Sequence, residues 1–598
     1  MSSLELGVVG NCTYGGLIDE DGRVVWACLP RFDSDPVFCA LLNGGKDSDI
    51  GFYDVELIGK VRSEQEYKEN TAILVTRLYD NHDNAIEISD FAPRFTLSGR
   101  SFRPTTLIRR IRPLSGTPRI RIRLRPVFDY GATLPTITHG SNHIRYVSSN
   151  YTIRVTTNAP VSYVLNETPF VLTTPTSLFL GPDETLQGAV EETAREFQER
   201  TENYWRQWVR RLALPLEWQE AVIRAAITLK LCTFEETGAI VAAMTTSIPE
   251  AFGTERNWDY RYCWLRDAFF VVRALNSLAE VETMEDYLRY LTNIVSMAEN
   301  GQLHGHLQPV YGIGLEAELV ERIETRLTGY RGHAPVRVGN QAYEHFQYDV
   351  YGNAVLAAAQ AFFDKRLLAP PGLTDFERLE RVGEQAFRLY DQPDAGMWEL
   401  RTHARVHTSS SLMCWAACDR LAKIAAHLSL PARALYWQER ADTIKQTILT
   451  RAWSENEQSF VHAFDEDGFD ASLLLMGEVN FIAADDPRFI ATLNAVEGAL
   501  KRGPHMFRYV TNDDFGTPQN AFNICTFWYI DALSRVGRTD EAREIFENML
   551  ACRTRLGLLS EDTDPASNEL WGNFPQTYSL VGIINAATRL SKTWQQTV

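Results

Sequence analysis

The sequence has no hydrophobic run long enough to cross a membrane and no leader of the secretory type. No apolar stretch approaches the roughly 18–20 residues that a membrane-spanning helix needs. The opening residues, MSSLELGVVGNCTYGG, lack a basic segment followed by a long apolar one, as a signal peptide would have. We therefore expect a cytoplasmic protein with no membrane partner.

An excess of positive charge is also missing. The chain has 59 Lys and Arg against 77 Asp and Glu, a formal net charge of −18. Binding to a phosphate backbone requires clustered basic side chains, so we expect no nucleic-acid partner. A neutral small substrate is compatible with this charge, although acidity also serves solubility alone.

Cysteine pairs and cofactor motifs are absent as well. The nine cysteines are scattered, odd in number and without a C-x-x-C pair, which indicates free thiols in a reducing compartment. Cys414 and Cys418 lie one helical turn apart without metal-spaced partners, so we interpret them as core residues. The sequence shows no P-loop, no dinucleotide fingerprint and no H-E-x-x-H motif. We expect no cofactor and no metal.

What the first third of the chain does have is strand-like alternation. Residues 119–125 run Arg-Ile-Arg-Ile-Arg-Leu-Arg, which places the apolar side chains on one face of a strand. Similar short segments are 72–79, 85–91, 105–111, 143–147, 151–156 and 161–165, separated by turn residues. Many short strands at regular spacing predict an antiparallel β-sandwich, which we assign to residues 1–183.

Helical periodicity follows. Residues 184–215 are polar and predict a helical linker, and residues 216–598 contain roughly a dozen amphipathic segments. In residues 432–451, Trp437, Ala441, Ile444 and Ile448 share one helical face. Twelve helices suggest six hairpins closed into an (α/α)6 barrel; an open α-solenoid is the alternative, but no fixed repeat period supports it.

Two glutamates in long loops are candidates for acid–base chemistry. Cleavage of a glycosidic bond needs one protonated and one ionised carboxyl group on opposite sides of the bond. Glu399 follows Trp398 shortly before a predicted helix, and Glu561 precedes Asp562 in the last long loop. Function concentrates on long loops held by a rigid scaffold, but any unselected glutamate is more often a surface residue.

A third group of polar and aromatic residues is denser. Residues 256–267 read RNWDYRYCWLRD. The adjacent Arg266 and Asp267 offer donors and acceptors for neighbouring sugar hydroxyls, and an ion-pair network at a helix start is the alternative.

This string resembles the signature of glycoside hydrolase family 15, the glucoamylase and bacterial-type trehalase family. Further segments agree in order along the whole chain: PVRVGNQAYEHFQYDVYG (335–352), GMWELRTHARVHTSSSLMCW (396–415), FWYIDAL (527–533) and LLSEDTDPASNELWGNFPQTYS (558–579). The resemblance implies a β-sandwich, a linker helix and an (α/α)6 barrel. It also implies an inverting mechanism with Glu399 as general acid and Glu561 as general base.

The resemblance further implies a glucose-binding pocket. Arg266 and Asp267 would grip the non-reducing glucose. Other pocket residues would be Tyr260, Trp264, Trp398, Arg337 and Arg508. Glucoamylases often carry a second glutamate after the acid, where this sequence has Leu400, so the leaving-group side is expected to differ.

The expected activity is release of glucose from a small α-glucoside, with trehalose as first choice. A glucoamylase-type activity on maltose, isomaltose or short malto-oligosaccharides is the alternative. A phosphorylase and a non-catalytic sugar-binding protein are less favoured alternatives. Glu561, as a candidate second carboxylate, argues against the phosphorylase. The sequence leaves a homo-oligomer possible.

Overall fold

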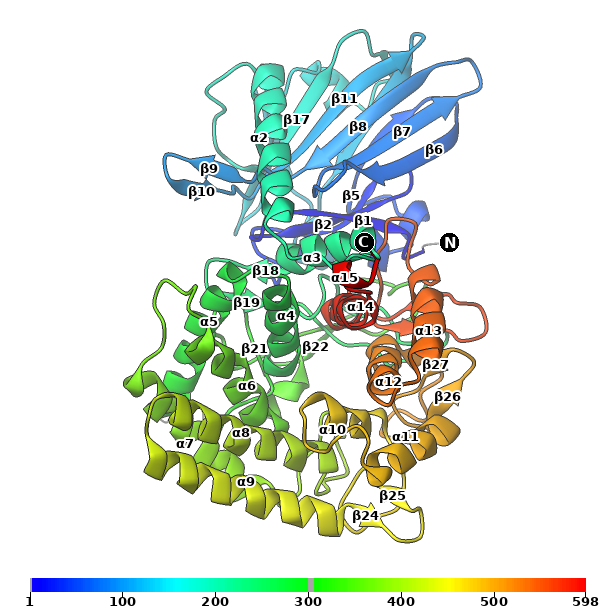
Figure 1. Ribbon diagram of the computed structural model, residues 1–598. Helices are drawn as coiled ribbons and strands as arrows, with labels where there is room; N and C mark the ends of the chain where they lie inside the picture. The colour runs from blue at the N-terminus through cyan, green and yellow to red at the C-terminus, as the bar shows by residue number, and fades with distance from the viewer. Residues whose placement is uncertain (1–2, 300–305, 598) are drawn as a thin grey trace.

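The computed structural model describes residues 3–299 and 306–597. Two antiparallel sheets stack at one end of the molecule, and a large helical region forms the other (Figure 1). The first sheet has the order β1-β2-β3-β5-β12-β16, with β4 paired to β3. Its strands are β1 (Leu6–Gly10), β2 (Gly15–Asp19), β3 (Val24–Cys28), β4 (Pro36–Phe38), β5 (Phe52–Leu57), β12 (Arg119–Arg125) and β16 (Phe170–Val171).

The second sheet has the order β13-β14-β15-β17-β11-β8-β7-β6. Its strands are β6 (Lys60–Tyr67), β7 (Leu74–Asp80), β8 (Ala85–Phe91), β11 (Leu107–Ser115), β13 (Thr136–His139), β14 (His143–Val147), β15 (Thr152–Thr157) and β17 (Thr176–Pro182). Apolar side chains of both sheets, such as Val55 and Ile88, share one buried cluster, so the two layers form a sandwich. A hairpin of β9 (Phe95–Leu97) and β10 (Arg100–Phe102) stands beside it.

The alternating segment forms a strand as predicted. In β12, Ile120, Ile122 and Leu124 are buried, while the arginines between them reach the surface. The strand predicted at 161–165 is wrong, because Val161–Leu165 forms the short helix α1. Pro160 precedes the helix, and Val161 and Val164 are its buried residues, three positions apart as a helical face requires.

Helix α2 (Val190–Arg210) joins the sandwich to the helical region. It packs on β17, where Ala194 joins a cluster with Phe91, Ile108 and Phe179. Further along, Trp205 and Trp208 belong to the large core of the helical region. Helix α2 therefore packs on the sandwich through its first half and on the core of the helical region through its second half.

The helical region is a closed double ring of helices. The inner helices are α4 (Leu265–Ser277), α6 (Asp349–Phe363), α8 (Thr408–His427), α10 (Leu475–Glu478, after the 3-10 helix Ala471–Leu474), α12 (Asn523–Arg535) and α14 (Thr577–Leu590). The outer helices are α3 (Gln219–Leu231), α5 (Glu282–Glu299), α7 (Leu373–Leu389), α9 (Pro431–Arg451), α11 (Pro487–Leu500) and α13 (Thr539–Ala551). The short helix α15 (Trp594–Thr597) follows.

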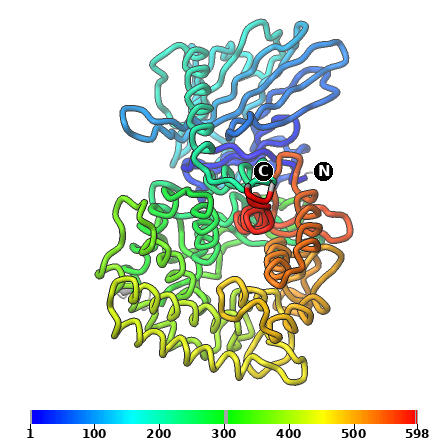
Figure 2. The backbone as a smooth tube through the Cα atoms, in the orientation of Figure 1, coloured from blue at the N-terminus to red at the C-terminus, as the bar shows by residue number. Residues whose placement is uncertain are grey.

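Contacts between neighbours show that the ring closes. Each inner helix contacts the next, and α14 returns to α4 (Figure 2). An α-solenoid would leave its first and last helices apart, so the (α/α)6 barrel prediction is confirmed. The sequence explains which helices lie outside: α9 buries only Trp437, Ala441, Ile444 and Ile448, whereas α8 is buried along most of its length.

Side chains of the sandwich anchor the segment that precedes α4. The indole Nε1 of Trp26 donates to the carbonyl of Met244 at 2.8 Å. The buried Arg261 guanidinium pairs with Asp259 at 2.7 Å and donates to the hydroxyl of Tyr130 and the carbonyl of Ser34, both at 2.9 Å. Side chains and backbone of the sandwich therefore hold in place the segment before α4, which carries several of the predicted site residues.

Two further properties of the described residues bear on the sequence predictions. All nine cysteines are unpaired and buried, as expected. Across residues 3–299 and 306–597, no helix combines the length and the apolar character that crossing a membrane requires.

Candidate active site

A cavity opens at the end of the barrel where inner helices begin. Arg266 and Asp267 lie in the first turn of α4, Phe522 directly precedes α12, and Tyr578 lies in the first turn of α14. The lining includes Tyr260, Trp264, Arg266, Asp267, Trp398, Glu399, Arg508 and Glu561. Because long loops precede these helices, residues far apart in the sequence meet here.

Arg337 is the predicted site residue that does not line the cavity. Its guanidinium donates to Glu321 at 2.9 Å and to the side chain of Asn257 at 3.3 Å. Arg337 therefore supports the loop that precedes α4 from behind. The prediction that it binds substrate directly gains no support from this position.

Glu399 lies in a tight turn between α7 and α8. Its backbone has a φ of +60°, a left-handed conformation that is uncommon for a residue with a side chain. The preceding Gly396 also has a positive φ, and a Cβ there would lie 2.6 Å from the ring of His407. Strained backbone of this kind clusters at functional sites, so the turn is built to present the glutamate.

The contacts of Glu399 come from α4 and the residue before it. The indole Nε1 of Trp264 donates to Oε1 of Glu399 at 2.7 Å. The nearest guanidinium nitrogen of Arg266 is 3.9 Å from the same oxygen. Glu399 keeps a quarter of its side chain exposed to the cavity. The neighbouring Trp398 is held separately, because its indole donates to Asp470 at 2.8 Å.

Glu561 is in a different environment. It is 1% exposed, and the hydroxyl of Tyr260 donates to its Oε1 at 2.5 Å. Burial and the nearby Glu250 carboxylate raise the pKa of Glu561 to about 8, against the lowering effect of Tyr260 and Arg508. The backbone of Glu561 is tied to the start of α12, because Asn523 N donates to its carbonyl at 2.9 Å.

Arg266 and Asp267 form the floor of the cavity. The Arg266 guanidinium lies 3.4 Å from Asp349 and 3.8 Å from Asp267, and it donates to Gln347 at 3.2 Å. Burial raises the pKa of Asp267 to about 6, Arg266 lowers it, and Glu399 raises it. Closely spaced donors and acceptors of this kind suit vicinal sugar hydroxyls.

A third glutamate lies beside Glu561 that the sequence did not single out. Glu250 accepts from Arg256 Nε at 2.9 Å and from both terminal nitrogens of Arg508, one of them at 3.1 Å. Burial raises the pKa of Glu250, but Arg508 and Arg256 outweigh it, so the net shift is downward and the group is ionised. The sequence around Glu250 contains no motif that marks it as a site residue, and its partner Arg508 lies 258 residues away.

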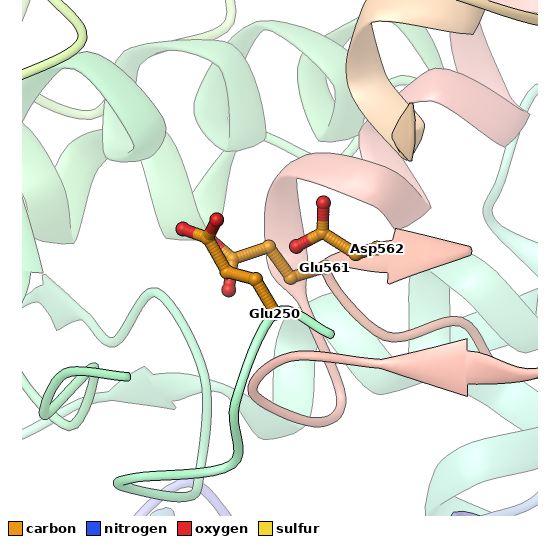
Figure 3. A group of neighbouring side chains, drawn as sticks. All are labelled: Glu250, Glu561 and Asp562. Carbon is orange, nitrogen blue, oxygen red and sulfur yellow. The ribbon is translucent and has the colours of Figure 1, made fainter. Parts of the chain in front are cut away.

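Glu250, Glu561 and Asp562 together form a compact carboxylate cluster. Figure 3 shows Glu250 arriving from one loop and the other two from the last long loop, with the carboxyl groups converging. One carboxylate oxygen from each of the three residues lies within 4.8 Å of the other two. Burial, Glu250 and Glu561 raise the pKa of Asp562. Arg256 and Arg508 supply positive charge at Glu250, the role that a bound cation would otherwise fill.

Comparison with known proteins bears on this arrangement. Residues 218–588 match the family model of glycosyl hydrolases family 15, and residues 4–170 match the trehalase-like N-terminal model. The chain is 31% identical to a trehalase of Thermoplasma volcanium, over 98% of this chain and 93% of the relative. It is 32% identical to a trehalase of Mycolicibacterium smegmatis, over 98% and 91%.

A solved structure agrees with the fold. A bacterial glucoamylase in complex with acarbose superimposes with a TM-score of 0.70 and 13% identity, covering 98% of this chain and 94% of that chain. The predicted architecture of sandwich followed by (α/α)6 barrel is therefore confirmed. With the family model spanning the barrel that carries the carboxylates, this chain is a glycoside hydrolase that belongs to glycosyl hydrolases family 15.

Proposed function

We propose that this protein hydrolyses trehalose with inversion, with Glu399 as general acid and Glu561 as general base. One observation carries the proposal: two carboxylates from separate loops border a single cavity whose floor holds Arg266 and Asp267. The full-length similarity to proteins named trehalase supports the choice of substrate.

The first glucose would occupy the floor, held by Arg266, Asp267 and the buried Tyr578. Glu399 accepts from Trp264 through Oε1, so its proton would be carried on Oε2 and passed to the glycosidic oxygen as the bond to the anomeric carbon breaks. The released glucose leaves with that proton, and Glu399 is left ionised.

Water then completes the reaction from the opposite face. Its oxygen bonds to the anomeric carbon, and Glu561 takes the proton that the water loses. Tyr260, which donates to Glu561 Oε1, orients this carboxylate. Glu561 must be ionised to act, so its raised pKa sets the acidic limb of the pH profile, while Glu399 must remain protonated to act as the acid.

Proton NMR of the earliest minutes of reaction tests both substrate and stereochemistry. Trehalose should release α- and β-glucose in equal amounts, because one ring inverts and the other leaves unchanged. If maltose is cleaved, β-glucose should appear first from its non-reducing ring. Exclusive early α-glucose from that ring would contradict inversion.

The same NMR measurements, made with trehalose, maltose and isomaltose, distinguish the proposed trehalase activity from the alternative functions. Release from maltose or isomaltose but not trehalose would replace the proposal by a glucoamylase-type activity. Cleavage that requires inorganic phosphate and yields a sugar phosphate would indicate a phosphorylase. Binding of trehalose without any glucose release would indicate a non-catalytic sugar-binding protein.

A further inference from the structure

A short loop before α12, residues 511–517, forms a tight turn at the mouth of the cavity. The backbones of Asp513 and Gly516 pair at 3.1 and 3.2 Å, and Gly516 has a φ of +92° that favours glycine. The amide of Phe515 donates to the Asp513 carboxylate at 2.8 Å. This loop is therefore a defined structure that holds three side chains, those of Asp513, Asp514 and Phe515, against the cavity.

One side of the 511–517 loop is fastened to the segment that precedes α4. The Asp513 carboxylate accepts both terminal nitrogens of Arg256, at 2.7 and 2.8 Å. Their side chains are only 6% and 4% exposed, so this two-point ion pair is screened from water. The ring of Phe515 meets that of Trp258 edge to face at 5.5 Å.

The other side is fastened to the segment that carries Glu399. The Asp514 carboxylate accepts the backbone amide of Arg401 at 2.5 Å and the hydroxyl of Thr402. The Arg401 guanidinium lies 5.3 Å from the centre of the Phe515 ring. The 511–517 loop thus bridges the segment that precedes α4 and the segment that carries Glu399.

Burial places the 511–517 loop opposite the floor. Asp267 and Tyr578 are buried, whereas Asp514, Phe515 and Arg401 are half-buried. A glucose on the floor would put its glycosidic oxygen near Glu399, and the leaving group would lie between Glu399 and this loop.

We propose that the 511–517 loop closes the leaving-group site after one sugar ring, so that the enzyme selects disaccharides over longer glucosides. The inference rests on the proposed function and extends it to substrate length. A leaving group of two rings would have to displace a loop held by a buried ion pair and by an edge-to-face pair of aromatic rings. A single ring would meet the guanidinium of Arg401 and the rings of Trp258 and Phe515, as sugars require.

The test compares trehalose with glucosyl-trehalose, a trisaccharide whose cleavage by an exo-acting enzyme always leaves two rings joined. The measured quantity is the ratio of kcat/KM for the trisaccharide to that for trehalose. The wild type should strongly prefer trehalose. Phe515→Ala and Asp514→Asn, which loosen the loop on the side of Arg401, should each raise the ratio by about tenfold, the scale of a single steric feature in discrimination.

Asp465→Asn is the matched control, because Asp465 pairs with Arg451 in an exposed turn outside the cavity. It should leave the ratio unchanged. Equal use of both sugars by the wild type, or an unchanged ratio in both loop variants, would overturn the length limit while leaving the trehalose proposal intact. Failure of the wild type to cleave trehalose would instead overturn the proposed function itself.

Discussion

Glu399 and Glu561 are distinguished by their surroundings rather than by their chemistry. Glu399 is partly open to the cavity beside the Trp264 indole, whereas Glu561 is buried beneath the Tyr260 hydroxyl. Burial and the Glu250 carboxylate raise the pKa of Glu561 to about 8, so Glu561 acts as the base only at a pH where it is ionised.

Removal of either carboxylate should abolish most activity. Glu399→Gln and Glu561→Gln keep the side-chain shape but cannot exchange a proton, so kcat on trehalose should fall by about 10²–10⁴-fold. Circular dichroism and the thermal midpoint should stay close to those of the wild type. Near-normal turnover by either folded variant would show that the corresponding role is assigned to the wrong residue.

Glu250 should control the pH range of activity. Its negative charge helps to raise the pKa of Glu561 to about 8, and the base acts only when ionised. The value of kcat/KM should therefore fall as the pH drops through that pKa. In Glu250→Gln the negative charge is lost, so the pKa of Glu561 should decrease and the acidic limb of the profile should move to lower pH.

Glu478→Gln provides the control for that measurement. Glu478 is a buried glutamate on α10 that pairs with Arg273 at 2.9 Å, outside the cavity that holds Glu561. Its replacement should leave the acidic limb in place. If the acidic limb of the kcat/KM profile stays at the same pH in Glu250→Gln, Glu250 does not raise the pKa of Glu561.

At the scale of elements, the turn that presents Glu399 depends on Gly396. Gly396→Ala introduces a Cβ within 2.6 Å of His407 at a φ of +64°, so either the turn or the histidine must move. We expect a lower thermal midpoint and a kcat reduced by about tenfold or more, because small displacements of catalytic groups are costly. Gly372→Ala is the control, since that glycine precedes α7 and nothing lies within 4 Å of an added Cβ.

Several elements could be predicted from the sequence because their patterns are local. The alternation in 119–125 gave β12, and the apolar spacing in 432–451 gave the buried face of α9. The strand predicted at Val161–Leu165 was wrong, because a run of five mostly apolar residues fits a strand or one helical turn equally well. The partners of Glu250 and of the 511–517 loop could not be predicted, because they are set by the closed ring of helices and not by neighbours in sequence.

At the scale of the whole molecule, the buried guanidinium of Arg261 pairs with Asp259 in the barrel and donates to Tyr130 and Ser34 of the sandwich. Arg261→Met would leave Asp259 buried without its partner, which typically costs about 3–5 kcal/mol. We expect a lower thermal midpoint and weaker activity, because Asp259 and Arg261 lie in the segment that leads to Trp264. The double variant Asp259→Asn/Arg261→Met removes both charges and should regain part of the stability; a double variant less stable than Arg261→Met would contradict this explanation.

The contact between α14 and α4 also has a consequence for synthesis of the chain. The ribosome makes α4 roughly 300 residues before α14, yet these helices must touch for the ring to close and for Tyr578 to reach the floor of the cavity. A nascent chain stalled before residue 577 therefore exposes the apolar flank of α4 and α12 that α14 would cover. Catalytic competence therefore requires that α14 has been made and has docked, because Tyr578 reaches the cavity only from that helix.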